Sequence, residues 1–151
     1  MNHFDSTPRS SRPYGTAVAS LTGVCTASVH GRRLQLPANM EPEEIALSAG
    51  TGGATVAALR WGDPACPRKA IAIHGRLDNA ASFLGIGPLF AAAGIELVAL
   101  DLPGHGKSSW KDDGMYTLAS QSSSILLALD SLASLNAGWD KDVIMIAHSL
   151  G

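Results

Sequence analysis

The chain has 151 residues, of which 46% are hydrophobic and 16% charged, and its formal net charge is −2. This composition predicts one folded domain with its own core, and it excludes a wholly disordered chain. The small net charge argues against an electrostatic grip on nucleic acid or on an anionic membrane, so we expect no nucleic-acid partner.

No run of the sequence approaches the roughly 18 consecutive apolar residues that a membrane-spanning helix needs, so we expect no membrane span. The two cysteines, Cys25 and Cys66, fit neither a disulfide framework nor a CxxC metal site. They favour a reducing compartment, and the expected location is cytoplasmic.

Residues 1–40 differ in composition from the rest of the chain. Between Asp5 and Glu41 there is no acidic residue, whereas arginines occur among many Ser, Thr and Pro. This pattern is similar to an organellar transit peptide, which would direct the protein to a mitochondrion, plastid or peroxisome. A disordered tail, or an over-long sequence that truly starts at Met40, remains open. We expect the tail to carry no chemistry and residues 41–151 to form a separate, incomplete domain.

From residue 43 the sequence alternates strand-like and helix-like patterns. Residues 43–49 and 55–61 are short strand candidates separated by a glycine-rich turn, which predicts an antiparallel hairpin. A short apolar strand over 70–73 is followed by a helical stretch over 79–93. Gly94 is expected to end that helix.

The second half continues the alternation with a strand over 95–100 and a helix over 117–135. The apolar positions of this helix lie three, four and seven residues apart, which places them on one face. Gly138 follows the helix as a terminator. The last strand, 143–147, is apolar without alternation, as expected for a central parallel strand covered on both faces.

This order of elements predicts an α/β fold with a mostly parallel sheet, an antiparallel N-terminal hairpin and helices on both faces. In such sheets the functional residues lie in loops beyond the carboxyl ends of the strands. Three loops meet that condition, at residues 74–79, 101–109 and 148–151.

The last loop follows the strand over 143–147 and contains the segment AHSLG at 147–151, which matches a small-x-Ser-x-Gly nucleophile elbow. Such an elbow turns sharply from strand to helix and holds its serine in a strained conformation, so its flanking positions need small residues. A chance match to a short pattern is the alternative, but the preceding apolar strand is the context that the motif requires. Ser149 is therefore the candidate nucleophile.

The loop over 74–79 is the candidate source of an oxyanion hole, because acyl transfer needs backbone N–H groups aimed at the developing oxyanion. One donor is the residue after the nucleophile, here Leu150. The second follows a His-Gly pair in the earlier loop, which makes the N–H of Arg76 the candidate. His74 is expected to hold the loop through hydrogen bonds, and Asn79 to cap the following helix.

The loop over 101–109 contains Gly-Lys-Ser, part of a phosphate-binding loop. That motif needs a glycine five residues before its second glycine, and this sequence has Asp101 there. We therefore expect no nucleotide. Asp101 and His105 are expected to organise the loop through hydrogen bonds, and its glycines to adopt unusual backbone angles.

Together the three loops resemble the α/β-hydrolase superfamily, in the subset with an HG oxyanion loop, a D-x-P-G-x-G-x-S loop and a G-x-S-x-G-type elbow. The run HGRLDNAASF at 74–83 is similar to the serine hydrolase-like protein group. The resemblance covers residues 43–151. It implies that Ser149 is the catalytic nucleophile and that the backbone N–H groups of Arg76 and Leu150 form the oxyanion hole. It also implies that the site is shaped by His74, Gly75 and His148.

Two positions depart from the usual pattern: Ala147 replaces glycine, and Arg76 stands where an aromatic residue is frequent. In this family the triad acid and histidine follow the nucleophile, whereas this sequence stops at Gly151. We therefore expect an inactive fragment, because a serine without a base is a weak nucleophile. The strand 143–147 is expected to be an exposed apolar edge that aggregates.

The resemblance implies a parent protein that cleaves an ester or related acyl bond of a small-molecule substrate through an acyl-enzyme, without metal, flavin or nucleotide. A serine at the elbow argues against epoxide hydrolases and haloalkane dehalogenases, whose nucleophile is Asp. Two alternatives remain open: another reaction type on this fold, such as a C–C bond hydrolase or a haloperoxidase-like enzyme, and a non-catalytic interaction protein. The sequence determines neither the substrate nor the oligomeric state.

Overall fold

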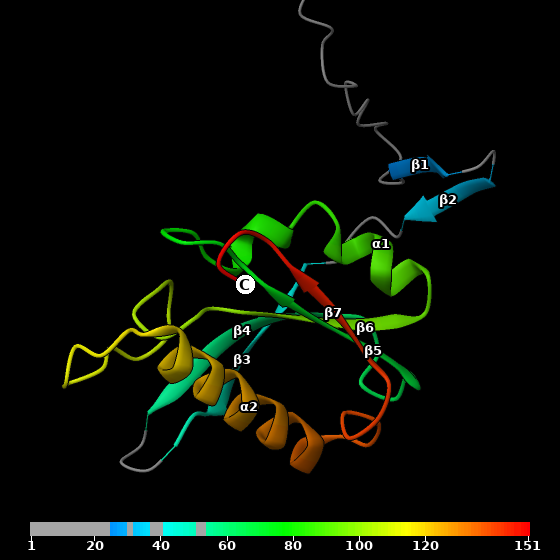
Figure 1. Ribbon diagram of the computed structural model, residues 1–151. Coiled ribbons are helices and arrows are strands. Elements are labelled where there is room, and N and C mark those ends of the chain that lie inside the picture. Colours follow the sequence, from blue (N-terminus) through cyan, green and yellow to red (C-terminus); the bar gives the residue numbers. More distant parts are fainter. Residues whose placement is uncertain (1–24, 30–31, 37–40, 51–53) are drawn as a thin grey trace, which may run out of the picture.

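The computed structural model describes residues 25–29, 32–36, 41–50 and 54–151 (Figure 1). In chain order the elements are β1 (Cys25–Val29), β2 (Arg32–Leu36), β3 (Glu43–Ser48), β4 (Thr55–Trp61), β5 (Arg68–Ile73), the 3₁₀ helix η2 (Ala80–Phe83), α1 (Gly87–Ala92), β6 (Ile95–Leu100), α2 (Leu118–Leu135) and β7 (Val143–Ala147).

Five of the strands form one mixed sheet in the order β3-β4-β6-β5-β7. The pairs β3–β4 and β4–β6 are antiparallel, whereas β6–β5 and β5–β7 are parallel. Only β4 therefore runs against the other four strands, which confirms the predicted mostly parallel sheet with an antiparallel hairpin at its start. Strands β1 and β2 form a separate antiparallel pair that we did not predict, and the rest of the tail over 1–40 lies outside the described residues.

Helices cover both faces of the sheet, as predicted, with α2 on one face and η2 and α1 on the other (Figure 1). Because successive side chains of a strand point to opposite faces, neighbouring residues of β5 enter different cores. Ile71 packs in the core with Leu132 of α2, whereas Ala72 packs in the core with Phe83 of η2.

The predicted strands and the helix over 117–135 lie within two residues of the observed bounds, but the prediction of a single helix over 79–93 was wrong. The structure divides it into η2 and α1, since Pro88 lies in the first turn of α1 and lacks the N–H that a continuous helix needs. Gly87 is required at the break, because a Cβ there would lie 2.2 Å from Cδ2 of Trp61. Gly94 ends α1 with a φ of 68°, as predicted.

Two helix starts depend on side-chain caps. The Asn79 side chain accepts a hydrogen bond from the N–H of Ala81 at the start of η2, as predicted. The Thr117 side chain does the same for the N–H of Ser120 at the start of α2. Among the helices in the described part of the chain, none is long and apolar enough to cross a bilayer.

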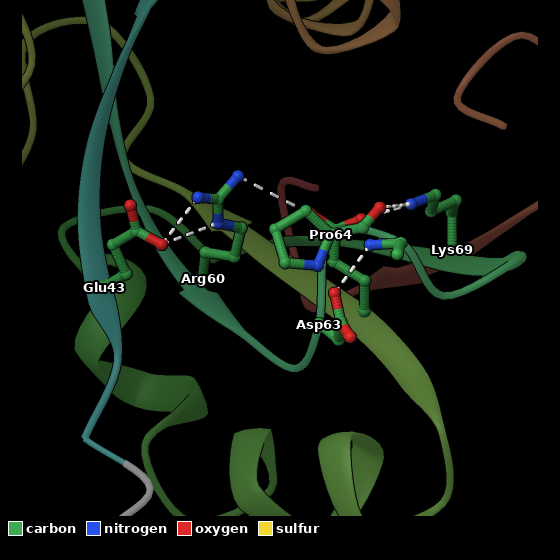
Figure 2. Close-up of polar contacts among 7 residues, drawn as sticks. Glu43, Arg60, Asp63, Pro64 and Lys69 are labelled. Atoms are coloured by element: carbon green, nitrogen blue, oxygen red, sulfur yellow. Dashed lines mark hydrogen bonds and ion pairs between the residues drawn. The ribbon is translucent and has the colours of Figure 1, made fainter. Parts of the chain in front are cut away.

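A buried ion pair joins the amino ends of β5 and β6. Nζ of Lys69 lies 2.5 Å from Oε2 of Glu96, and neither side chain is exposed to solvent. Lys69 also donates to the carbonyl of Pro64, and Arg60 approaches Glu96 while it pairs with Glu43 (Figure 2). This charged cluster lies at the amino ends of β5 and β6, away from the carboxyl ends of these strands, so its role is structural.

Candidate active site

The topology creates a crevice at the carboxyl ends of the parallel strands. The connection that leaves β5 runs over the face covered by η2 and α1, whereas the connection that leaves β6 runs over the opposite face with α2. Adjacent parallel strands whose connections leave to opposite faces open a crevice between their ends. The loops over 74–79, 101–109 and 148–151 follow β5, β6 and β7 and therefore border this end of the sheet.

Ser149 has the strained backbone that the sequence predicts for an elbow. Its φ is 58°, in the left-handed region that residues other than glycine rarely adopt. The turn closes through a hydrogen bond of 3.1 Å from the N–H of Gly151 to the carbonyl of His148. A Cβ on Gly151 would lie only 2.6 Å from the carbonyl oxygen of Ile73, so this position needs glycine.

The elbow packs directly against the loop after β5. The N–H of His148 donates to the carbonyl of Ile73 at 3.1 Å, which ties the elbow to the end of β5. A Cβ on Gly75 would lie 3.0 Å from Nδ1 of His148 and 3.1 Å from Cβ of Ser149. The sequence-predicted neighbours Gly75, His148 and Ser149 are thus brought together, and the absence of a side chain at Gly75 permits this contact.

His74 joins the loops after β5 and β6. It is fully buried, its Nε2 accepts from the N–H of Leu102 at 3.0 Å, and its Nδ1 lies 2.7 Å from the carbonyl of Gly75. Because a carbonyl only accepts and an N–H only donates, the ring is neutral with its proton on Nδ1. Both nitrogens are engaged, so His74 holds the loop and does not serve as a base for Ser149.

Asp101 organises the third loop, as predicted. Its Oδ1 accepts from the N–H of Ala80 at 2.7 Å, and its Oδ2 accepts from the N–H of Lys107 at 2.8 Å. A Cβ on Gly106, whose φ is 50°, would lie 2.0 Å from the Asp101 carboxylate. His105 contributes through its Nδ1, which lies 3.2 Å from the carbonyl of Pro103.

The Gly-Lys-Ser sequence in this loop has structural partners. Nζ of Lys107 lies 2.5 Å from Oε1 of Glu44, and the Ser108 hydroxyl donates to the carbonyl of Asp101 and accepts from the N–H of Ala57. Both side chains therefore have protein partners in this structure.

The two candidate oxyanion donors border one cavity. Within the described residues, neither the N–H of Arg76 nor that of Leu150 donates a hydrogen bond to the protein. Both residues line a cavity of ≈ 540 Å³. Its other lining residues are Leu77, Gly104, His105, Trp110, Tyr116, Leu118 and Gln121.

Sequence reasoning missed the two aromatic residues of this cavity, Trp110 and Tyr116. They lie in the segment between β6 and α2, where neither strand nor helix periodicity gives a signal. Tyr116 returns to the site because its hydroxyl accepts from the N–H of Lys111 and its ring packs on Gly104. Two aromatic residues in a loop of polar residues were the available signal.

The part of the chain that the structure describes contains no hydrogen bond between Ser149 and a histidine or a carboxylate. The nearby Asp78 is engaged elsewhere, because its carboxylate accepts from the Ser82 hydroxyl at 2.5 Å and from the N–H of Asn79 at 2.9 Å. The hydrogen bonds from Ser82 and then Asn79 hold the pKa of Asp78 below its usual value.

A mixed sheet of this topology, with helices on both faces and a strained strand-to-turn serine after β7, defines an α/β-hydrolase fold. A family model described as the alpha/beta hydrolase fold matches residues 71–151, and the chain belongs to this family. The expected superfamily is therefore confirmed.

Among curated proteins, the chain is 44% identical over 69 residues to a serine hydrolase-like protein of Dictyostelium discoideum, covering 46% of this chain and 19% of that protein. It is 37% identical over 92 residues to an esterase of Mycobacterium tuberculosis, covering 61% and 28%. Among solved structures, a thioesterase domain from the curacin biosynthetic pathway has a TM-score of 0.61 and 28% identity, covering 73% of this chain and 36% of that domain. The matched part spans less than a third of the length of these two curated relatives.

Proposed function

We propose that the chain forms the nucleophile-bearing part of a serine hydrolase that cleaves an ester or related acyl bond. One observation carries the proposal: Ser149 has an elbow φ of 58° and packs against Gly75, beside two N–H groups that have no protein partner among the described residues. A nucleophile beside N–H donors is the arrangement that acyl transfer requires. Relatives named as a serine hydrolase-like protein and an esterase support it.

In the proposed reaction, Oγ of Ser149 attacks the carbonyl carbon, and the carbonyl π electrons move to the oxygen. The N–H groups of Arg76 and Leu150 donate to this oxyanion. When the tetrahedral intermediate collapses, the bond to the leaving group breaks and the leaving group takes a proton. Water then attacks the acyl-enzyme, which releases the acid and restores the serine.

The serine proton must go to a base, and the described residues do not supply one. His74 uses both ring nitrogens within the loops, and a neutral serine without a base reacts slowly. We propose that the base and its orienting acid lie outside the described residues and that residues 41–151 supply only part of the site. We also propose a cytoplasmic location, because two cysteines that fit no disulfide framework favour a reducing compartment.

The other reaction types open on this fold lack a specific observation in their favour. A serine elbow is compatible with C–C bond hydrolysis or haloperoxidase-like chemistry, and an interaction protein can retain the same fold. Acyl-bond hydrolysis is preferred because relatives named as an esterase and a thioesterase domain match this chain.

The test measures p-nitrophenyl acetate hydrolysis by the longest natural protein that contains this sequence. We expect Ser149→Ala to lower kcat/KM by about 10³-fold or more, because the nucleophile is lost. Ser123→Ala is the control, since this hydroxyl lies on the outer side of α2 and donates to the carbonyl of Ala119. Undiminished hydrolysis by Ser149→Ala would refute the assigned nucleophile, and absence of hydrolysis by the unmodified protein would refute the activity.

Residues 1–151 assayed alone provide the second arm. We expect hydrolysis close to the uncatalysed rate, because the described residues place no base beside Ser149. Rapid hydrolysis that Ser149→Ala abolishes would contradict this expectation and would assign the base to a residue within the chain.

A further inference from the structure

We infer that the cavity beside Ser149 is a subsite for an amphipathic, negatively charged substrate, whose carboxylate or phosphate binds the guanidinium of Arg76. The inference rests on the proposed function and adds a substrate class to it. Three features carry it: the apolar walls of the cavity, the lack of an ion-pair partner for Arg76 among the described residues, and the place of Arg76 in the chain.

The walls of the cavity are mainly large apolar side chains. Leu77 is 87% exposed, Trp110 77% and Leu118 65%, and all three border the same space of ≈ 540 Å³. Exposed apolar groups gathered around a cavity favour a ligand that covers them, because burial removes their surface from water. Leu77 also has a φ of 61°, which leucine rarely adopts, and strained residues of this kind cluster at functional sites.

Arg76 brings a positive charge to this cavity, and none of the described residues that line it is acidic. Within the described part of the chain, the Arg76 side chain forms no ion pair. Asp78, the nearest acid in sequence, is held by Ser82 and Asn79. Asp112 and Asp113 line a different cavity, beside Ala49 and Thr55; both cavities share Trp110.

The charge is also close to the proposed reaction centre. The backbone N–H of Arg76 is a proposed oxyanion donor. The distance from its guanidinium to the substrate carbonyl is therefore limited to the length of the arginine side chain plus one hydrogen bond. A guanidinium binds carboxylate and phosphate through paired hydrogen bonds. A substrate with a negative group near its acyl bond would therefore bind with its apolar part against Trp110 and Leu118.

The test is an equilibrium binding measurement, which requires no catalysis. The longest natural protein that contains this sequence is titrated with 4-phenylbutyrate, phenyl phosphate and the neutral 4-phenylbutanamide, and the Trp110 indole N–H signal is followed by NMR. We expect at least one anion to bind about 10-fold or more tightly than the amide, because it gains charge-assisted hydrogen bonds. The tighter of the two anions identifies carboxylate or phosphate as the preferred group.

Variants assign the preference to Arg76. Arg76→Ala is expected to abolish the difference between anion and amide, and Arg76→Lys to retain part of it. Lys141→Ala is the charge-matched control, because this exposed lysine lies before β7 at the other end of that strand from the elbow. Thermal unfolding of each variant checks that the fold is intact.

Equal affinity for anion and amide, or a preference that persists in Arg76→Ala, would overturn the inference. Because the binding measurement requires no catalysis, failure of hydrolysis refutes the proposed function through a separate measurement, and loss of anion preference refutes only the substrate class.

Discussion

At the scale of single residues, the elbow depends on close approach between backbones. Ser149 adopts a left-handed φ because the chain must leave β7 sharply while it stays bonded to the end of β5. Gly151 and Gly75 permit this, since a Cβ on either would enter the space of β5 or of the elbow itself. The elbow motif is therefore a packing requirement as well as a chemical one.

Gly151→Ala is expected to destabilise the chain by about 1–3 kcal/mol, because the new methyl carbon would lie 2.6 Å from the carbonyl oxygen of Ile73 and backbone must shift. Urea unfolding followed by circular dichroism measures the effect. Gly85→Ala is the matched control, since nothing lies within 4 Å of its Cβ position. Equal midpoints for the two variants would show that the elbow tolerates the added methyl group.

At the scale of elements, β5 and β6 are held together at both ends by polar contacts across an apolar sheet. At their carboxyl ends His74 bonds to Leu102, and at their amino ends Lys69 pairs with Glu96. A fully buried ion pair gains little net stability over apolar residues, but the loss of one partner leaves an uncompensated charge. The pair therefore makes the two strands dependent on each other.

Lys69→Met is expected to lower the free energy of unfolding by about 3–5 kcal/mol, because Glu96 would remain buried without its partner. Denaturant unfolding measures this change. Glu44→Gln is the control, since both side chains of the Glu44–Lys107 pair are exposed and the pair contributes about 1 kcal/mol or less to the free energy of unfolding. A loss for Lys69→Met no larger than for the control would mean that Arg60 alone compensates Glu96.

At the scale of the whole molecule, the chain leaves an apolar edge open. β7 forms one edge of the sheet, where Ile144 is 44% exposed and Met145 60% exposed. Beside it an apolar cavity of ≈ 330 Å³ lies between β7 and α2. The exposed edge that the sequence predicted is therefore confirmed, and aggregation through it stays a prediction.

Met145→Lys is expected to raise the monomer fraction of residues 1–151, because a charge on an edge strand opposes pairing with another chain. Light scattering after size-exclusion chromatography measures that fraction. Leu135→Lys, at the exposed end of α2, is the control for added charge alone. An equal rise in both variants would show that net charge, rather than the β7 edge, limits solubility.

Much of the fold could be predicted because its signals are local. The strand over 143–147 and the helix after Thr117 depend on apolar runs, periodicity and a cap within a few residues. The helix over 79–93 failed because a broad apolar pattern concealed the break at Gly87 and Pro88. Pro88 marks that break locally, but the need for glycine at position 87 comes from the ring of Trp61, which lies in β4 and is distant in sequence.

The sequence by itself determined the family and the candidate nucleophile Ser149, because both are encoded in short contiguous motifs. It also determined most of the element order from residue 43 onward, apart from the division of the helix over 79–93. Only the tertiary structure decided which loops meet: it packed Gly75 on the elbow, engaged both nitrogens of His74 and brought Trp110 and Arg76 to one cavity. The reason is physical: strand pairing and close packing bring together residues that are far apart in sequence, and local sequence patterns do not encode such contacts.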